Sequence, residues 1–160
     1  WDVPRPNGHR WPEQLVGVAE GERVEVGGLA VRTLDLPGHS PEGLGLIVDG
    51  VLLPGDYLSP CEIPFIDDPP AYWRTLVRLI DLLGKGEVRE VIPGHGPRLT
   101  AEEALAVARA DLAYVDRIVE VGRKRDFNGA RALVLPRAAD VPGMRDHHRD
   151  NCAKVGIALR

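Results

Sequence analysis

The sequence predicts an α+β fold in which a β-meander sheet carries helices on one face and a further helix follows at the C-terminal end. Apolar and polar residues alternate with a period of two between residues 23 and 53, as they do in half-buried strands. From residue 68 onward the apolar spacing becomes that of amphipathic helices. The 18 glycines and 14 prolines supply the turns, and 44% hydrophobic residues suffice for one packed domain.

Two hairpins are expected in the first part of the chain. One joins residues 23–26 to residues 29–36 through two glycines, which are a strong signal for a tight turn. The other joins residues 44–48 to residues 51–53 through an Asp-Gly pair. Residues 1–22 precede both hairpins, are rich in turn-forming residues, and are expected to form an irregular arm.

Two main helices are expected after the hairpins, with a short strand at residues 88–92 between them. Asp68 can cap the first helix, and Thr100 with Glu103 can form the capping box of the second. The residues expected on the apolar faces are Trp73, Leu76, Val77, Ile80 and Leu83 in the first helix, and Leu105, Ala108, Leu112, Val115 and Val119 in the second.

The domain is expected to span residues 23–125, and residues 126–160 are expected to form an appendage with a helix from about residue 143. A sheet with helices on one face leaves its second face uncovered by this chain, and Leu46, Val48 and Leu52 are expected to face partly that way. Because a large exposed apolar face is unusual in a monomer, we expect something else to pack there.

Composition excludes several classes of protein. The net charge is −4 and the longest basic run covers only residues 123–125, so no nucleic-acid partner is expected. No apolar stretch approaches the roughly 18 residues of a membrane span, so no membrane partner is expected either. Cys61 and Cys152 form neither a disulfide framework nor a zinc ribbon, which favours the cytoplasm. Met144 is the only methionine, so we expect a trimmed N-terminus or a longer polypeptide upstream of Trp1.

One feature recurs three times: an apolar strand ends in Pro-Gly, and a side chain that can bind metal follows. Proline ends the strand because it lacks an N–H, and glycine permits a sharp turn. The next residue is then held at the rim of the sheet, where functional side chains are commonly placed. Two imidazoles and a carboxylate from such positions suit Zn²⁺, Fe or Mn. The three residues are His39, Asp56 and His95.

Chance is the alternative explanation, because proline and glycine are abundant in this chain. A fourth Pro-Gly pair, at residues 142–143, follows no clear strand and precedes Met144, so it shows what an ordinary Pro-Gly turn looks like. Three turns in succession, each after a strand and each before His or Asp, favour a shared function.

These three motifs resemble the last three metal-binding motifs of the metallo-β-lactamase superfamily. The matching segments are Pro37-Gly38-His39-Ser40-Pro41-Glu42-Gly43, Gly55-Asp56 and Pro93-Gly94-His95-Gly96. The resemblance covers about residues 22–119 and implies half of an αββα sandwich. The family's first motif, His-x-His-x-Asp-His, does not occur in this sequence. The resemblance therefore implies that residues 23–125 are the C-terminal half of such a domain, and that the N-terminal half is absent.

The resemblance also implies roles for the residues and for a cofactor. His39 would complete the first metal site, Asp56 would bridge two metals, and His95 would bind the second. The expected cofactor is Zn²⁺, as one or two ions, with Fe or Mn as alternatives. The expected reaction is hydrolysis by a metal-bound hydroxide, with Asp56 as the catalytic carboxylate. With three ligands only, the chain alone is expected to bind metal weakly and to be almost inactive.

The spacing of the motifs narrows the substrate. His95 follows Asp56 by 39 residues, which leaves no room for the large domain that nucleases of this superfamily insert there. A small ester, thioester or lactone is therefore favoured, with an iron-dependent persulfide dioxygenase as an open alternative. Tyr57 and Ser59 are candidates for the substrate pocket. His147 and His148 are expected to lie on a solvated helix face, because adjacent helical residues point about 100° apart.

Two hypotheses follow. The first is a metal-dependent hydrolase of which this chain is one half. The second is a non-catalytic half-fold that associates with itself or with a partner. In either case the expected partner of the open sheet face is the N-terminal half of the fold or a second copy of the chain.

Overall fold

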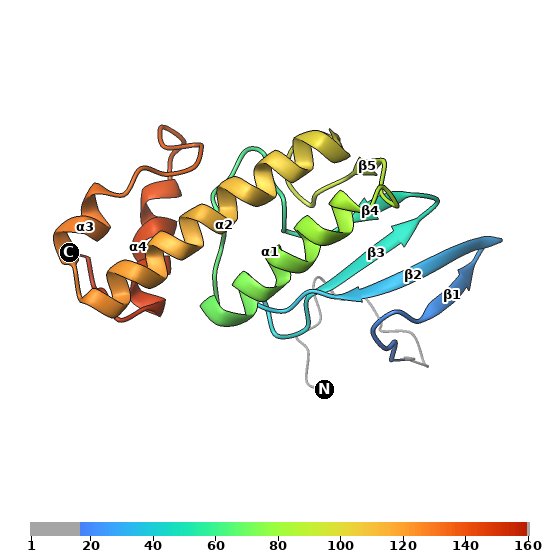
Figure 1. Ribbon diagram of the computed structural model, residues 1–160, viewed down its shortest axis with the longest axis horizontal. Helices are drawn as coiled ribbons and strands as arrows, with labels where there is room; N and C mark the ends of the chain where they lie inside the picture. Colours follow the sequence, from blue (N-terminus) through green and yellow to red (C-terminus); the bar gives the residue numbers. More distant parts are fainter. Residues whose placement is uncertain (1–16, 160) are drawn as a thin grey trace, which may run out of the picture.

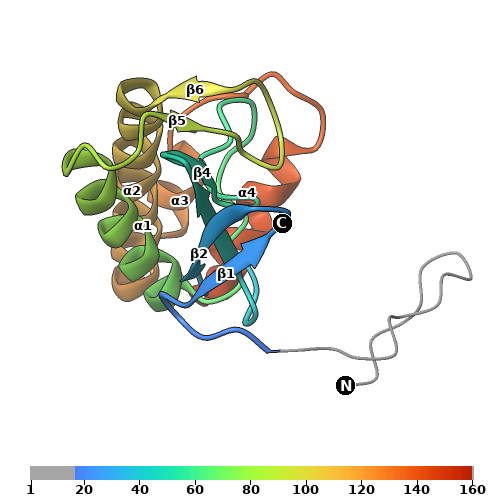
Figure 2. The same ribbon diagram turned by 90° about the vertical axis from the view of Figure 1, so that its right-hand side faces the viewer.

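The computed structural model describes residues 17–159 and contains one mixed sheet of six strands. The part of the expected irregular arm that covers residues 1–16 lies outside the described residues. The strands follow one another across the sheet in chain order, as Figures 1 and 2 show. They are β1 (Arg23–Val26), β2 (Leu29–Asp35), β3 (Leu44–Val48), β4 (Val51–Leu53), β5 (Glu90–Val91) and β6 (Leu99–Thr100).

Neighbouring strands are antiparallel except for β4 and β5, which are parallel. The first four strands form the predicted meander, and both hairpins turn at the predicted Gly-Gly and Asp-Gly pairs. The parallel pair requires a crossover, and α1 (Pro69–Gly84) provides it.

Two long helices, α1 and α2 (Ala101–Lys124), pack against each other and cover one face of the sheet (Figure 2). Both begin as predicted. The side chain of Asp68 accepts a hydrogen bond from Ala71 N, and the Thr100–Glu103 capping box is complete. Each cap satisfies backbone N–H groups that the first turn of a helix leaves unpaired.

The appendage contains two short helices, α3 (Phe127–Ala132) and α4 (Met144–Lys154), which lie beside the C-terminal part of α2 (Figure 1). The predicted third helix is thus confirmed as α4. No helix within residues 17–159 has the length and hydrophobicity needed to cross a lipid bilayer.

The core lies between the sheet and the two long helices, and three details of the predicted faces are wrong. Trp73 and Val77 are each 38% exposed, because α1 packs through a neighbouring stripe instead. Val119 of α2 is 41% exposed for the same reason. Leu52 is fully buried, because its partner in the register is Ile47 and both point toward the helices. The buried stripe of α1 consists of Ala71, Tyr72, Thr75, Leu76, Leu79 and Leu83.

The opposite face of the sheet carries apolar side chains that none of the helices within residues 17–159 covers. The register places Leu46 opposite Thr33 and Leu53, and Val48 opposite Val31 and Val51. Thr33 is buried against the segment before β1, where its hydroxyl donates to the carbonyl of Ala19. We call the remaining group the open face: Val31, Leu46, Val48, Val51 and Leu53, all half-buried.

Candidate metal centre

Three strands that run in the same direction end at one edge of the sheet. β2 and β4 are both antiparallel to β3, and β5 is parallel to β4. The Pro-Gly turns that follow β2, β4 and β5 therefore meet at this edge. They carry His39, Asp56 and His95, so the topology brings the three candidate ligands together.

The carboxylate of Asp56 lies between the two imidazoles. His39 Nε2 lies 3.0 Å from one carboxylate oxygen, and His95 Nε2 lies 3.5 Å from the other. These donor atoms contact one another directly and do not surround a common point. Accordingly, within residues 17–159 no group of three His, Cys, Asp or Glu side chains has the arrangement of a metal site. Metal binding by these residues stays a prediction.

The chemistry of the three side chains nevertheless fits a divalent cation. His39 Nδ1 lies 3.1 Å from the carbonyl oxygen of Phe65, which only accepts hydrogen bonds, so Nδ1 must carry a proton. Nε2 faces the Asp56 carboxylate, which is also an acceptor. The ring therefore satisfies both neighbours only if Nε2 carries a second proton or if a cation takes that position. A carbonyl behind Nδ1 is the arrangement commonly found for metal-binding histidines.

The loop of His39 is held by buried groups. The hydroxyl of Tyr57 donates to the carbonyl of Pro37 at 2.7 Å and accepts from the N–H of His39 at 3.2 Å. Gly38 has a φ of +120°, and a Cβ there would lie 2.3 Å from the backbone nitrogen of Tyr72, so only glycine fits. Burial, opposed by hydrogen bonds to Thr75 and His39, raises the pKa of Tyr57 well above its usual value.

The loop of His95 is more open. Its imidazole is 54% exposed, and Glu62 Oε1 lies 3.9 Å from His95 Nδ1. A Cβ at Gly94 would lie 2.6 Å from Asp56 Oδ1, so glycine allows the loop to approach the carboxylate. Glu62 was not among the sequence candidates. It follows no strand end and belongs to no motif, so only its place in the fold reveals it.

Tyr57 and Ser59 occupy different surroundings. Tyr57 lines a hollow of about 270 Å³ beside His39 and Asp56, although only 2% of the residue is exposed. Ser59 is buried and its Oγ lies 3.5 Å from the sulfur of Cys61. Their part in a substrate pocket stays a prediction.

The segment around Ser59 is tied to the appendage through a buried ion pair. Arg137 Nε donates to the carbonyl of Ser59 at 2.8 Å, and Arg137 Nη2 lies 2.7 Å from Asp111 Oδ1. That oxygen lacks a well-aligned hydrogen bond, so the contact is an ion pair without ideal hydrogen-bond geometry. Burial raises the pKa of Asp111 to about 7, although Arg137 opposes the shift.

A second hollow, of about 220 Å³, lies on the other side of His39 and reaches α4. His147 stacks against Phe65 there, with ring centroids 3.8 Å apart. His148 is 7% exposed and bonded to Tyr114 and to the carbonyl of Ala130. The expectation of a solvated histidine pair is therefore wrong for His148, because α3 and α2 cover that side of α4.

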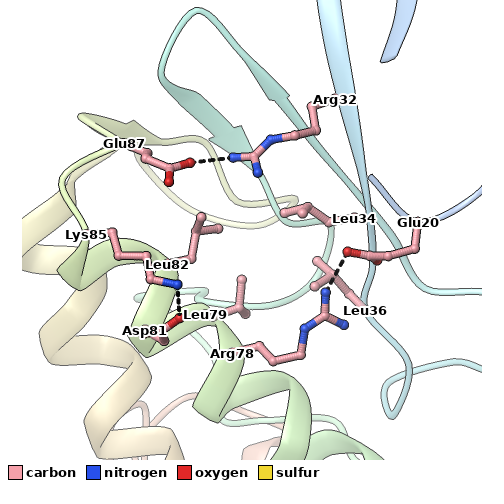
Figure 3. A pocket seen from close by; sticks show the side chains of 10 residues that line it. All are labelled: Glu20, Arg32, Leu34, Leu36, Arg78, Leu79, Asp81, Leu82, Lys85 and Glu87. Atoms are coloured by element: carbon pink, nitrogen blue, oxygen red, sulfur yellow. Dashed lines mark hydrogen bonds and ion pairs between the residues drawn. The ribbon is translucent and has the colours of Figure 1, made fainter. Parts of the chain in front are cut away.

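A third hollow, of about 200 Å³, lies between β2 and α1, away from the candidate ligands (Figure 3). Four leucines form its floor. Its rim holds three cations, and each one is already paired with an acid: Arg32 with Glu87, Arg78 with Glu20 and Lys85 with Asp81. Exposed pairs of this kind contribute little to stability and leave no free charge for a ligand.

Comparison with proteins of known structure identifies the fold. A metallo-β-lactamase family protein of Thermus thermophilus superposes on 89% of this chain with a TM-score of 0.62 and 21% identity. A β-lactamase domain protein of Burkholderia ambifaria superposes on 71% of the chain with a TM-score of 0.54 and 26% identity. The chain has the metallo-β-lactamase fold. The prediction of this superfamily and of its C-terminal half is confirmed at the level of fold.

Sequence relatives agree with this fold. Hydroxyacylglutathione hydrolase of Rhodopseudomonas palustris is 35% identical over 81 residues, which are 48% of this chain. No family model matches the sequence. This chain spans about a third of the length of the hydrolase (32%) and about half of the length of the Thermus protein (48%).

Proposed function

We propose that this chain is part of a metal-dependent hydrolase that acts on a small ester, thioester or lactone. The observation that carries the proposal is the convergence of His39, Asp56 and His95 at one edge of the sheet. The likeness to hydroxyacylglutathione hydrolases supports a hydrolase, and within the class it favours a thioester.

Each residue has a distinct part in this proposal. His39 and His95 each present Nε2 to a different carboxylate oxygen of Asp56. A bound divalent cation supplies the chemistry, because it lowers the pKa of water to about 7 and polarises a carbonyl. The hollow beside Asp56 can receive the acyl part of a small substrate, since it opens next to both His39 and Asp56.

The three side chains are fewer than the full ligand set that the resemblance implies for one or two Zn²⁺, Fe or Mn ions. We propose that further ligands come from the N-terminal half of the same fold, packed on the site's open side. This chain alone then binds metal weakly and has little activity.

The test is Asp56→Ala in the protein that carries this chain. Asp56 contacts both histidines, so its loss should reduce metal content below that of the parent and reduce thioester hydrolysis by about 10²-fold or more. Asp81→Ala is the matched control, because Asp81 is an exposed carboxylate far from the site. Elemental analysis and hydrolysis of lactoylglutathione, a simple aryl ester and a lactone are the measurements. Full metal content and normal turnover in Asp56→Ala would overturn the proposal.

A non-catalytic half-fold is the second candidate, and the open face favours it. Covering a patch of several hundred Å² is worth on the order of 10 kcal/mol before the costs of association. Under either function we propose that this face packs against the N-terminal half of the fold or a second copy of the chain.

Sedimentation velocity with dye binding to exposed apolar surface tests this assembly. The chain alone should dimerise, aggregate or bind dye, and Leu46→Lys should weaken the dimer while Trp73→Lys, on the outer side of α1, should not. A compact, dye-negative monomer that melts cooperatively would contradict it.

A further inference from the structure

The appended helix α4 reaches the backbone that supports His39. Asn151, on α4, is only 3% exposed. Its Oδ1 accepts from the N–H of Ile66 at 3.0 Å, and its Nδ2 donates to the carbonyl of Pro64 at 2.7 Å. One side chain therefore holds the backbone on both sides of Phe65.

The residue between these two contacts is the one that orients His39. The carbonyl of Phe65 lies 3.1 Å from His39 Nδ1 and can only accept a hydrogen bond. It therefore fixes the proton on Nδ1 and leaves Nε2 to face Asp56. A displaced Phe65 peptide would release the ring to rotate and to change its tautomer.

Asn151 is itself held in one orientation. Its Nδ2 also donates to the hydroxyl of Tyr114, which lies 2.8 Å from His148 Nδ1. His148 Nε2 lies 2.9 Å from the carbonyl of Ala130 and must donate to it. The direction of every bond then follows: Asn151 donates to Tyr114, Tyr114 donates to His148, and His148 donates to Ala130. The network is satisfied with a neutral imidazole, and the opposite amide orientation of Asn151 would break it.

We propose that Asn151 is a positioning residue for the candidate metal centre, acting on His39 through the backbone of residues 64–66. This inference rests on the proposed function, because it gives the appendage a role in presenting His39 Nε2 to a bound cation. Outer partners of this kind typically change metal affinity by 10- to 100-fold when they are removed.

The test is Asn151→Leu in the metal-free full chain, because leucine has a similar size and makes neither hydrogen bond. Nitrogen-15 NMR of the imidazoles at about pH 8 reports which nitrogen of His39 carries the proton. In the parent, Nδ1 should carry a proton in essentially every ring, because the Phe65 carbonyl accepts it, whether or not Nε2 is protonated as well. In Asn151→Leu, we expect a measurable fraction of rings without a proton on Nδ1, faster hydrogen exchange of the Ile66 amide, and Zn²⁺ affinity lower by about 10-fold or more.

Cys152→Ala is the matched control, because Cys152 is the next residue on α4, is fully buried, and makes no contact with residues 64–66 among its hydrogen bonds. It should keep the tautomer and the Zn²⁺ affinity of the parent. Should Asn151→Leu not fold, Asn151→Asp keeps the acceptor for Ile66 N–H and loses the donor to Pro64, and a shift of the tautomer is expected there too.

A folded Asn151 variant with the tautomer of the parent would overturn the proposal. These measurements use neither substrate nor turnover. If the tautomer depends on Asn151 but the metal-loaded protein that carries this chain hydrolyses none of the tested substrates, the proposed function is disproved and the positioning role stays intact.

Discussion

The two Pro-Gly-His loops share a tripeptide but differ in how the rest of the chain holds them. The loop of His39 is fixed by Tyr57 and Thr75, which both donate to the carbonyl of Pro37. The carbonyl of Gly38 also accepts from the N–H groups of Asp67 and Asp68, just before α1. The loop of His95 has one such backbone bond, from Gly94 N to the carbonyl of Gly55. The imidazoles are 30% and 54% exposed, respectively.

The difference shows that an identical local sequence does not give an equally ordered ligand. A hydrogen-bonded, buried loop holds its imidazole before any cation arrives, so little side-chain freedom remains to be lost on binding. The His95 side loses more freedom, because its contacts are fewer and more exposed. We therefore expect His39 to be the more rigid of the two candidate ligands.

The largest contrast is expected between Gly38→Ala and Gly94→Ala. At Gly38 the new Cβ would meet backbone atoms of Tyr72 at a φ of +120°, so we expect a loss of stability of about 3 kcal/mol or more. At Gly94 the shortest contact of the new Cβ would be 2.6 Å to Asp56 Oδ1, on a side chain that can move, and the backbone of Gly55 would lie no closer than 3.2 Å. That variant should therefore lose only about 1 kcal/mol of stability and yet bind Zn²⁺ more weakly. Urea denaturation and zinc titration measure both effects, and equal losses of stability would contradict the comparison.

A smaller contrast is expected between Tyr57→Phe and Thr75→Val. Loss of the Tyr57 hydroxyl leaves the N–H of His39 without a partner, and we expect it to cost about 1–2 kcal/mol and to weaken Zn²⁺ binding. The hydroxyl of Thr75 donates to the carbonyl of Pro37, which keeps Tyr57 as its second donor when Thr75 is replaced. The threonine variant should therefore leave zinc affinity nearly unchanged. The idea fails if both variants weaken zinc binding equally.

The smallest expected effect is a change of the unfolding free energy with pH. It arises from Asp111, on the side of the candidate metal centre near His95. The segment at Pro60 and Cys61, against which Gly96 packs, adjoins Ser59, and Ser59 is held by the Asp111–Arg137 pair. Burial raises the pKa of Asp111 to about 7. An unfolded aspartic acid has a pKa of about 4, so between pH 4 and 7 the folded chain holds more protons. The contribution of Asp111 to stability should therefore decrease as pH rises from about 4 to about 7 and stay level above that.

Urea denaturation at pH 5 and at pH 8 checks this sign. The difference in unfolding free energy between the parent and Asp111→Asn should shift against the parent at the higher pH. Asp116→Asn is the control, because Asp116 is an exposed carboxylate on the same helix. A difference that does not depend on pH would mean that Asp111 is ionised throughout this range.

Much of the fold could be predicted because its signals are local. The hairpins follow from paired turn residues, and both helices begin at side chains that can cap them. The helix faces could not be predicted in the same way. α1 carries two adjoining apolar stripes, and the choice between Trp73–Val77 and Tyr72–Leu79 depends on where α2 lies.

The sequence by itself determined the three strand ends and the residues that follow them, because proline and glycine act on the backbone within a few residues. Only the tertiary structure decided that these ends meet, since that requires β4 and β5 to pair in parallel across a helical crossover. It also decided which groups hold each ligand. Tyr57, Glu62 and Asn151 lie 18, 33 and 112 residues from the histidines that they contact or support, and no local pattern links positions so far apart.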